Sequence, residues 1–217
     1  MSELIQLLEN TPLAAAIFLG LIGLLLGSFL NVVIYRLPLM IEKELADQCR
    51  AIHDESDDAN SPTPLSNDQD DSRFNLAWPN SHCPSCHSPV KAWQNIPVLS
   101  YLLLRGRCHS CKTTISLQYP LTELAAGFLA VISWLLFGLS AEGISLFFVS
   151  LVLLALSVID LKTFLLPDRL TLPLLWAGLL YQSLYQPDFL GEAVWGAALG
   201  YLILWSIYWL FRLVTGK

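Results

Sequence analysis

Five long apolar runs are the feature of this sequence that most constrains its fold. They lie at 13–34, 121–141, 144–159, 170–185 and 193–211. A helix that crosses a bilayer needs about 20 mostly apolar residues, because the hydrocarbon core is about 30 Å thick and each residue advances about 1.5 Å. The two shortest runs reach that length only with flanking residues. Since 54% of the residues are hydrophobic and 14% are charged, we predict an all-α polytopic membrane protein with about five transmembrane helices.

The positive charges all fall on one side of this arrangement. All 12 Lys and Arg residues lie in the segment 36–119, in the loop after the third run, or after the fifth run. The loops 142–143 and 186–192 carry none, and neither does the segment before residue 13. The positive-inside rule therefore predicts a periplasmic N-terminus, with the long loop and the C-terminus in the cytoplasm.

The expected domain organisation has three parts: a first transmembrane helix at 1–35, a cytoplasmic loop at 36–119, and a membrane part at 120–217. Within the loop, 54–73 contains many Asp and Glu residues among Ser, Asn and Pro. Such a composition cannot bury a core, so we expect a disordered acidic insertion there. The net charge is -6, and a nucleic-acid partner would need a basic face, so no nucleic-acid partner is expected. The expected surroundings of the apolar helices are membrane lipid.

Two pairs of cysteines form the strongest local motif. Each C-x-x-C pair fixes two thiolates, and the segment between the pairs can bring all four to one tetrahedral ion. Disulfides are kept reduced in the cytoplasm, so a metal is favoured over a disulfide. A site closed by four cysteines leaves no open position for water, which predicts a structural Zn²⁺. The predicted ligands, in a module spanning 83–111, are Cys83, Cys86, Cys108 and Cys111.

Three histidines flank these cysteines and are alternative ligands: His82, His87 and His109. We expect them to be exposed neighbours of the site. Cys49 has no partner in a comparable motif, and we expect it to be incidental.

Asp160 is a candidate functional residue, because it ends the uncharged stretch 144–159. The alternative is that the helix has simply ended and that Asp160 lies in water. That stretch is too short to cross a bilayer, so the helix is expected to continue to Asp160 or beyond. A carboxyl at the mouth of a membrane helix is costly unless it is paired or hydrated, and such residues are functional by default.

Several longer stretches resemble the bacterial type IV prepilin peptidase family. The stretch 27–38, GSFLNVVIYRLP, is similar to the signature of its first helix. Other similar stretches surround the cysteines and the third run, namely 74–76 (FNL), 93–97 (WQNIP), 100–102 (SYL), 105–108 (RGRC), 159–160 (ID) and 166–168 (LPD). The resemblance covers nearly the whole chain except the acidic insertion.

The resemblance implies a bifunctional enzyme of the bacterial inner membrane. Family members cleave the leader from type IV prepilins and from pseudopilins of type II secretion, and then methylate the new N-terminus with S-adenosylmethionine. Proteolysis uses two aspartates at the cytoplasmic face, and Asp160 matches the first. For methylation, which the resemblance places in the cytoplasmic region, Gly106 and Arg107 are candidate cofactor-binding residues. The alternative for Gly106 is a turn that only glycine permits.

One departure from the family pattern concerns the second aspartate. The family places it in a GxGD motif after the fifth span, and no GxGD occurs in residues 1–217. Asp168 matches the separate LPD element and is expected to cap the following helix. Glu123 is a poor substitute for the missing second aspartate, although a pairing of Glu123 with Asp160 is left open. The part 120–217 is therefore interpreted as four helices of a membrane aspartyl peptidase domain that lacks its C-terminal portion. We expect this chain not to cleave alone, and the alternative is a non-catalytic zinc-bearing membrane protein that binds pilin-like leaders.

Overall fold

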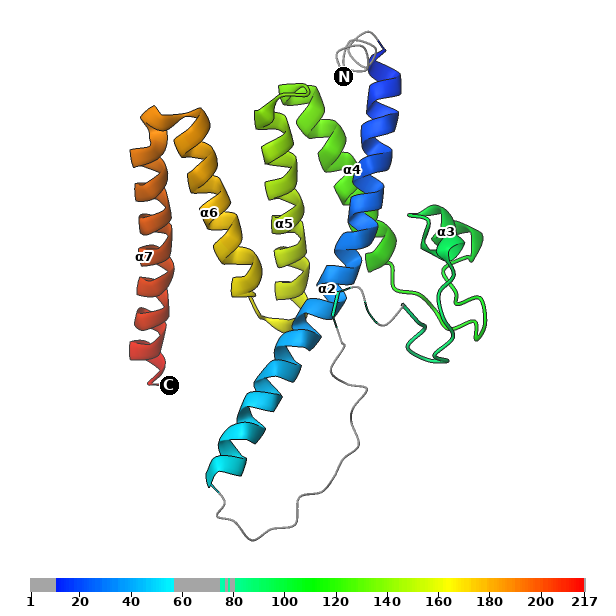
Figure 1. The fold of residues 1–217 in the computed structure, drawn as a ribbon, viewed down its shortest axis with the longest axis horizontal. Helices are drawn as coiled ribbons and strands as arrows, with labels where there is room; N and C mark the ends of the chain where they lie inside the picture. Colours follow the sequence, from blue (N-terminus) through cyan, green and yellow to red (C-terminus); the bar gives the residue numbers. More distant parts are fainter. Residues whose placement is uncertain (1–10, 57–74, 77, 79–80, 217) are drawn as a thin grey trace. The chain divides into compact units, whose positions relative to one another are not determined.

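A computed structural model describes residues 11–56, 75–76, 78 and 81–216. The described part is built from helices, and its extended pairing is limited to two isolated bridges. The chain divides into two compact units, Met1–Leu166 and Pro167–Lys217, which are considered separately. The elements, shown in Figure 1, are α2 (Pro12–Ser56), η2 (Ala92–Asn95), α3 (Leu99–Leu103), α4 (Gln118–Phe137), α5 (Ala141–Thr163), α6 (Asp168–Tyr185), η3 (Pro187–Phe189) and α7 (Leu190–Thr215).

Four segments of the described chain are long and apolar enough to cross a membrane. They are Pro12–Ile52, Gln118–Phe137, Ala141–Thr163 and Pro187–Thr215. The expected all-α, multi-pass membrane fold is therefore confirmed. The run 170–185 does form a helix, α6, but that helix is not among the four. Its first turn holds Asp168 and Arg169, and these charges lower the hydropathy of an already short helix.

The first helix is longer than the apolar run that begins it. Helix α2 continues through Arg36 and contains Pro38 in its interior. Residues beyond that proline include Glu, Lys, Leu and Ala, which are strong helix formers. The boundary expected at residue 35 is therefore not the end of the helix. Of the expected acidic insertion at 54–73, residues 57–73 lie outside the described part of the chain.

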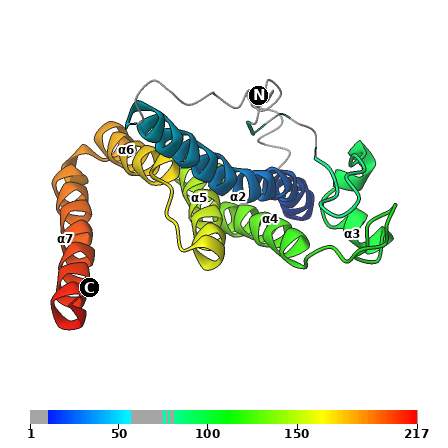
Figure 2. The same cartoon turned by 90° about the horizontal axis from the view of Figure 1, so that it is seen from below.

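Close packing of α2 against α4 forms the centre of the first unit. Figures 1 and 2 show the two helices running alongside each other, with α5 next to them. A Cβ atom at Gly23 would lie 2.7 Å from the Gly127 Cα, and one at Gly27 would lie 2.8 Å from the Glu123 Cα. Small residues four apart on α2 thus allow the two backbones to approach each other closely. This approach places the polar N-terminal end of α4 against α2.

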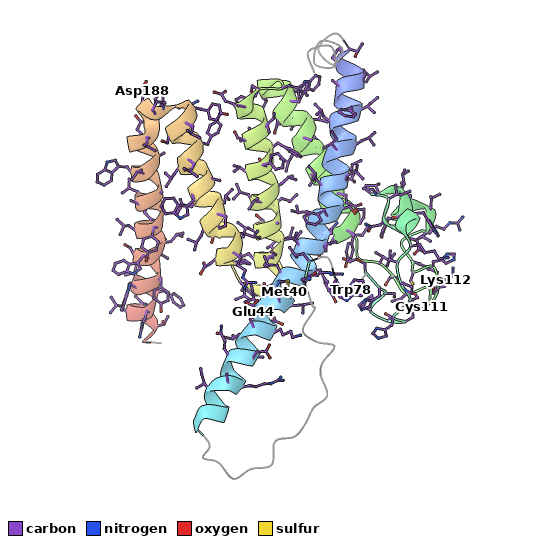
Figure 3. All side chains as sticks on the ribbon, viewed as in Figure 1. Met40, Glu44, Trp78, Cys111, Lys112 and Asp188 are labelled. Carbon is purple, nitrogen blue, oxygen red and sulfur yellow. The ribbon has the colours of Figure 1, made fainter. Side chains whose placement is uncertain are left out.

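The second unit is a helical hairpin. Helices α6 and α7 are joined by the single turn η3, and Asp188 in this turn is labelled in Figure 3. Tyr181 and Tyr185 stack along α6, with ring centroids 4.9 Å apart. Neither helix of this unit contains a buried residue.

Candidate metal centre and catalytic site

The four predicted cysteines come together at one point of the loop that precedes α4. Their Sγ atoms all lie within 4.8 Å of one another, and the Sγ atoms of Cys83 and Cys111 are 3.8 Å apart. A tetrahedral ion held at about 2.3 Å from each sulfur separates the sulfurs by about 3.8 Å. The cluster therefore has the donor set and the spacing to hold a metal ion. Figure 3 labels Cys111 and its neighbour Lys112 in this loop.

Each cysteine pair sits in a turn of the same construction. In the first turn, the Cys83 N–H donates to the Ser88 carbonyl at 3.0 Å, and in the second the Cys108 N–H donates to the Thr113 carbonyl at 2.8 Å. A residue with positive φ closes each turn, His87 in the first (55°) and Lys112 in the second (62°). An isolated antiparallel bridge flanks each turn, His82 with Pro89 and Arg107 with Thr114. The motif is thus a structural repeat, which composition and spacing alone do not reveal.

A hydroxyl accompanies the second sulfur of each turn. The Cys86 Sγ lies 3.0 Å from the Ser88 Oγ, and the Cys111 Sγ lies 3.2 Å from the Thr113 Oγ1. The hydrogen bond from the Thr113 side chain, followed by that from its backbone, lowers the pKa of the Cys111 thiol from 9.0 to about 6. A lowered pKa favours the thiolate, which is the metal-binding form. Sequence reasoning missed Ser88 and Thr113; the available signal was a hydroxyl residue two positions after the last cysteine of each pair.

The flanking histidines and the fifth cysteine stand apart from the four-sulfur cluster. His82 and His87 stack on each other with ring centroids 5.7 Å apart. His109 packs edge-on against Trp93, also at 5.7 Å. All three histidines are exposed, as expected, and Cys49 is an exposed free thiol on α2. The metal-binding group among the described residues consists of the four cysteines.

Asp160 lies in the last turn of α5, which continues to Thr163. The helix therefore extends past the carboxyl, as the length argument predicts. It ends at Phe164, whose φ is 53° and whose N–H donates to the Asp160 carbonyl at 2.9 Å. Asp168 belongs to the other unit. It is the first residue of α6, and the N-cap position is taken by Pro167. Capping of that helix by Asp168 was therefore a wrong expectation.

Gly106 and Arg107 lie between α3 and the second cysteine turn. Gly106 is buried with φ of 65°, and a Cβ atom there would lie 2.7 Å from the Tyr101 hydroxyl oxygen. Its N–H donates to the Tyr101 carbonyl at 2.9 Å. The positive φ therefore favours glycine, and a side chain at this position would have to displace the Tyr101 ring. Arg107 is exposed beside Cys108.

Glu123 is a buried carboxyl near the start of α4, only 8% exposed. Its Oε2 accepts a hydrogen bond of 2.8 Å from the Val98 N–H, and the Ser28 side chain from α2 also bonds to it. Its recorded partners therefore come from the cysteine-bearing loop and from the first helix. Among the described residues, no contact supports a pairing of Glu123 with Asp160.

Two more buried polar side chains of α2 bind backbone carbonyls, one in the loop and one in the first turn of α4. Arg36 Nη1 donates to the Asn75 carbonyl at 2.8 Å, and Asn31 Nδ2 donates to the Tyr119 carbonyl at 3.1 Å. Arg36 is 7% exposed and Asn31 is 4% exposed. Figure 3 labels Trp78, whose N–H donates to the Asn75 Oδ1 at 2.7 Å. Sequence reasoning did not single out Asn31 or Arg36, although both lie in the signature of the first helix.

Comparisons with known proteins match both parts of the chain. Residues 21–137 match the family described as Bacterial Peptidase A24 N-terminal domain, and 147–216 match the Type IV leader peptidase family. A relative from Stutzerimonas stutzeri is 45% identical over 214 residues, covering 98% of this chain and 70% of the relative. One from Aeromonas hydrophila is 43% identical over 217 residues, covering 100% of this chain and 72% of the relative.

A third relative, from Burkholderia pseudomallei (strain K96243), is 47% identical over 205 residues, covering 94% of this chain and 62% of the relative. All three relatives carry the name prepilin leader peptidase/N-methyltransferase. No solved structure matches the chain. Matches to two consecutive family domains, with relatives aligned along nearly the entire chain, place this protein in the type IV leader peptidase family, a family of membrane-bound leader peptidases and N-methyltransferases.

Proposed function

We propose that this chain acts on type IV prepilins or the related pseudopilins, taking part in leader cleavage and in methylation of the new N-terminus. The observation that carries the proposal is the position of Asp160 in the last turn of the apolar helix α5, inside the segment matched by the Type IV leader peptidase family. A carboxyl at that depth can meet a peptide bond at the membrane boundary. The relatives' printed names support both activities.

For cleavage, Asp160 supplies one of two carboxyls. Peptide hydrolysis needs a base that activates water and an acid that polarises or protonates the carbonyl. Two neighbouring carboxyls provide both, because they do not ionise together easily. Residues 1–217 contain no GxGD motif to supply the second carboxyl, so we propose that this chain alone does not cleave prepilin.

For the metal, we propose a structural Zn²⁺ held by the four clustered cysteines. The all-thiolate donor set and the sulfur separations fit this ion. A bound Zn²⁺ would tie the two cysteine turns together and leave no position for a reacting water. The chain's own residues orient the thiolates through the Ser88 and Thr113 hydroxyls. The segment 83–111 is then a metal-organised module within the cytoplasmic loop.

For methylation, we propose that S-adenosylmethionine is the donor and that Gly106 and Arg107 contribute to its binding. Gly106, which has a positive φ, and the exposed Arg107 lie within the metal module, directly before Cys108. An exposed guanidinium is suited to bind a carboxylate such as that of the donor's amino-acid portion. The neutral N-terminal amine is the reactive form, because its lone pair forms the new N–C bond. The donor's sulfur would keep the electron pair of the broken S–C bond, and the methylated amine then releases a proton.

The methylation proposal predicts that the purified chain, given S-adenosylmethionine, methylates a peptide that begins with the mature pilin N-terminal phenylalanine. Mass spectrometry would show a gain of one methyl group on that residue. An N-terminally acetylated peptide is the matched control, because its amine is blocked. Binding of a prepilin leader without any methyl transfer would instead support the alternative, a non-catalytic leader-binding protein.

For orientation, we propose a multi-pass protein of the bacterial inner membrane with a periplasmic N-terminus. The loop around the cysteines and the end of α5, with Asp160, then face the cytoplasm, as does the C-terminus. The distribution of all 12 Lys and Arg residues supports this orientation. This orientation includes the proposal that α6 crosses the membrane in addition to the four helices that are long and apolar enough to do so. Reporter fusions after Gly143 and after Asp188 should then report the periplasm, whereas fusions within 54–73 should report the cytoplasm. A cytoplasmic signal at Gly143 would contradict this orientation.

A further inference from the structure

The loop that carries the cysteines is attached to α2 and α4 through its backbone. Arg36 donates to the Asn75 carbonyl in the loop, before the cysteine turns. Asn31 donates to the Tyr119 carbonyl in the first turn of α4, where the loop ends. Glu123 of α4 acts as an acceptor instead: it accepts a hydrogen bond from the Val98 N–H, which lies between the two cysteine turns. These contacts use buried side chains of α2 and α4. Such contacts fix the path of the loop and depend little on its side chains.

The Glu123 carboxyl is held in a defined place. The Glu123 Cα lies at a close approach of α2 to α4, since a Cβ atom at Gly27 would come within 2.8 Å of this Cα. A buried carboxylate is costly unless it is hydrogen-bonded. The Val98 N–H, at 2.8 Å from Oε2, and the Ser28 side chain supply such bonds. The position of Val98 relative to α4 is therefore set by this carboxyl.

Val98 itself has an unusual backbone conformation. Its φ is 59° and its ψ is −47°, outside the regions that β-branched residues normally adopt. A residue in such a conformation needs surrounding contacts that hold it there. Val98 is also the N-cap of α3, so the direction in which α3 leaves the helix pair depends on this residue.

Helix α3 leads directly to the segment at 105–107. Its Tyr101 carbonyl accepts from the Gly106 N–H at 2.9 Å, and the Tyr101 ring occupies the space where a side chain at 106 would lie. The Gly106 carbonyl in turn accepts from the Ile115 N–H at 2.7 Å, beyond the second cysteine turn. A continuous series of contacts thus connects Glu123 with Gly106.

We propose that Glu123 is a positioning residue for methyl transfer, acting through the Val98 N–H and α3 on the segment 105–107. The proposal rests on the proposed role of Gly106 and Arg107 in methylation. It requires a hydrogen-bond acceptor at position 123 and does not require a charge there. Glutamine, whose carbonyl oxygen can accept the same bond, is therefore expected to replace Glu123, whereas alanine is not.

The test compares four forms of the full chain: wild type, Glu123→Gln, Glu123→Ala and Glu142→Ala. Glu142 is a matched control because it is an exposed carboxyl in the first turn of α5. One readout is methyl transfer from S-adenosylmethionine to a peptide that begins with the mature pilin N-terminus. The other is amide hydrogen exchange in the segment 96–106, and metal content serves as a check on folding.

We expect Glu123→Ala to lower kcat/KM for methyl transfer by about tenfold or more, as for loss of a buried hydrogen bond. It should also speed amide exchange in 96–106 while metal content stays unchanged. Glu123→Gln and Glu142→Ala should behave like wild type in both readouts. The proposal is overturned if Glu123→Ala leaves exchange unchanged, or if Glu123→Gln is as impaired as Glu123→Ala. Absence of methyl transfer by the wild type would refute the proposed function instead, and the exchange data would still decide whether Glu123 positions the loop.

Discussion

Replacing Cys108 and Cys111 together with serine is expected to release the metal and unfold the cysteine-bearing loop. Two of the four clustered sulfurs are lost, and the remaining pair cannot close a tetrahedral site. A structural Zn²⁺ contributes on the order of 10 kcal/mol to the folding of a small module. The described part of 81–116 has few regular elements of its own, chiefly η2 and α3, so little else stabilises it. Elemental analysis should find about one metal ion per wild-type chain and much less in the variant.

Limited proteolysis provides the second readout of that prediction. The loop of the variant should be cut rapidly at sites that are protected in the wild type. Cys49→Ser is the matched control, because Cys49 is an exposed free thiol on α2, outside the cluster. It should keep the metal and the protease resistance. A metal-free wild-type protein with a protease-resistant loop would show that the four sulfurs are not a metal site.

Replacing Asp160 with asparagine is expected to abolish leader cleavage when a C-terminal segment carrying the family's GxGD motif is supplied to the chain. A general acid or base typically contributes about 10²- to 10⁴-fold to the rate, and asparagine can serve as neither. Asp188→Asn is the matched control, because Asp188 lies in the turn η3 and matches no catalytic motif. It should leave cleavage unchanged. The rate is measured by the appearance of the shortened pilin on mass spectrometry.

Two outcomes would contradict this assignment in different ways. Cleavage that persists in Asp160→Asn would remove Asp160 from the mechanism. Cleavage by residues 1–217 alone that is lost in Glu123→Gln would identify Glu123 as the second carboxyl. The hydrogen bond from the Val98 N–H to Glu123 favours a positioning role for that residue. In that role, Glu123→Gln retains cleavage when the GxGD-bearing segment is supplied.

The features that follow from local sequence could be predicted well. The spacing within each C-x-x-C pair fixes its turn, so the four cysteines were identified before their sulfurs were seen to cluster. The length of a membrane-crossing helix also predicts correctly that α5 continues past Asp160, since the helix extends to Thr163. In both cases the physical constraint acts over a few neighbouring residues or over one helix.

The features that depend on distant segments could not be predicted. The role of Glu123 at Val98 depends on a contact between residues 25 positions apart, and the role of Arg36 at Asn75 on one between residues 39 apart. Neither a glutamate nor an arginine in a sequence indicates which distant backbone group it will bind. The end of α2 was also missed, because the apolar run stops near residue 35 while helix-forming polar residues carry the helix past Pro38 to Ser56. Hydropathy locates what can lie in lipid and does not locate the end of a helix in water.

The most direct test of the account is the mass of a prepilin after exposure to this protein in membranes that contain S-adenosylmethionine. With the GxGD-bearing segment supplied, we expect a product that has lost its leader and gained one methyl group on its new N-terminus. With residues 1–217 alone, we expect the prepilin to stay intact and a mature N-terminal peptide, added in its place, to be methylated. An unprocessed, unmethylated substrate in every case, with folded protein and bound metal, would contradict the assignment of both activities to this chain.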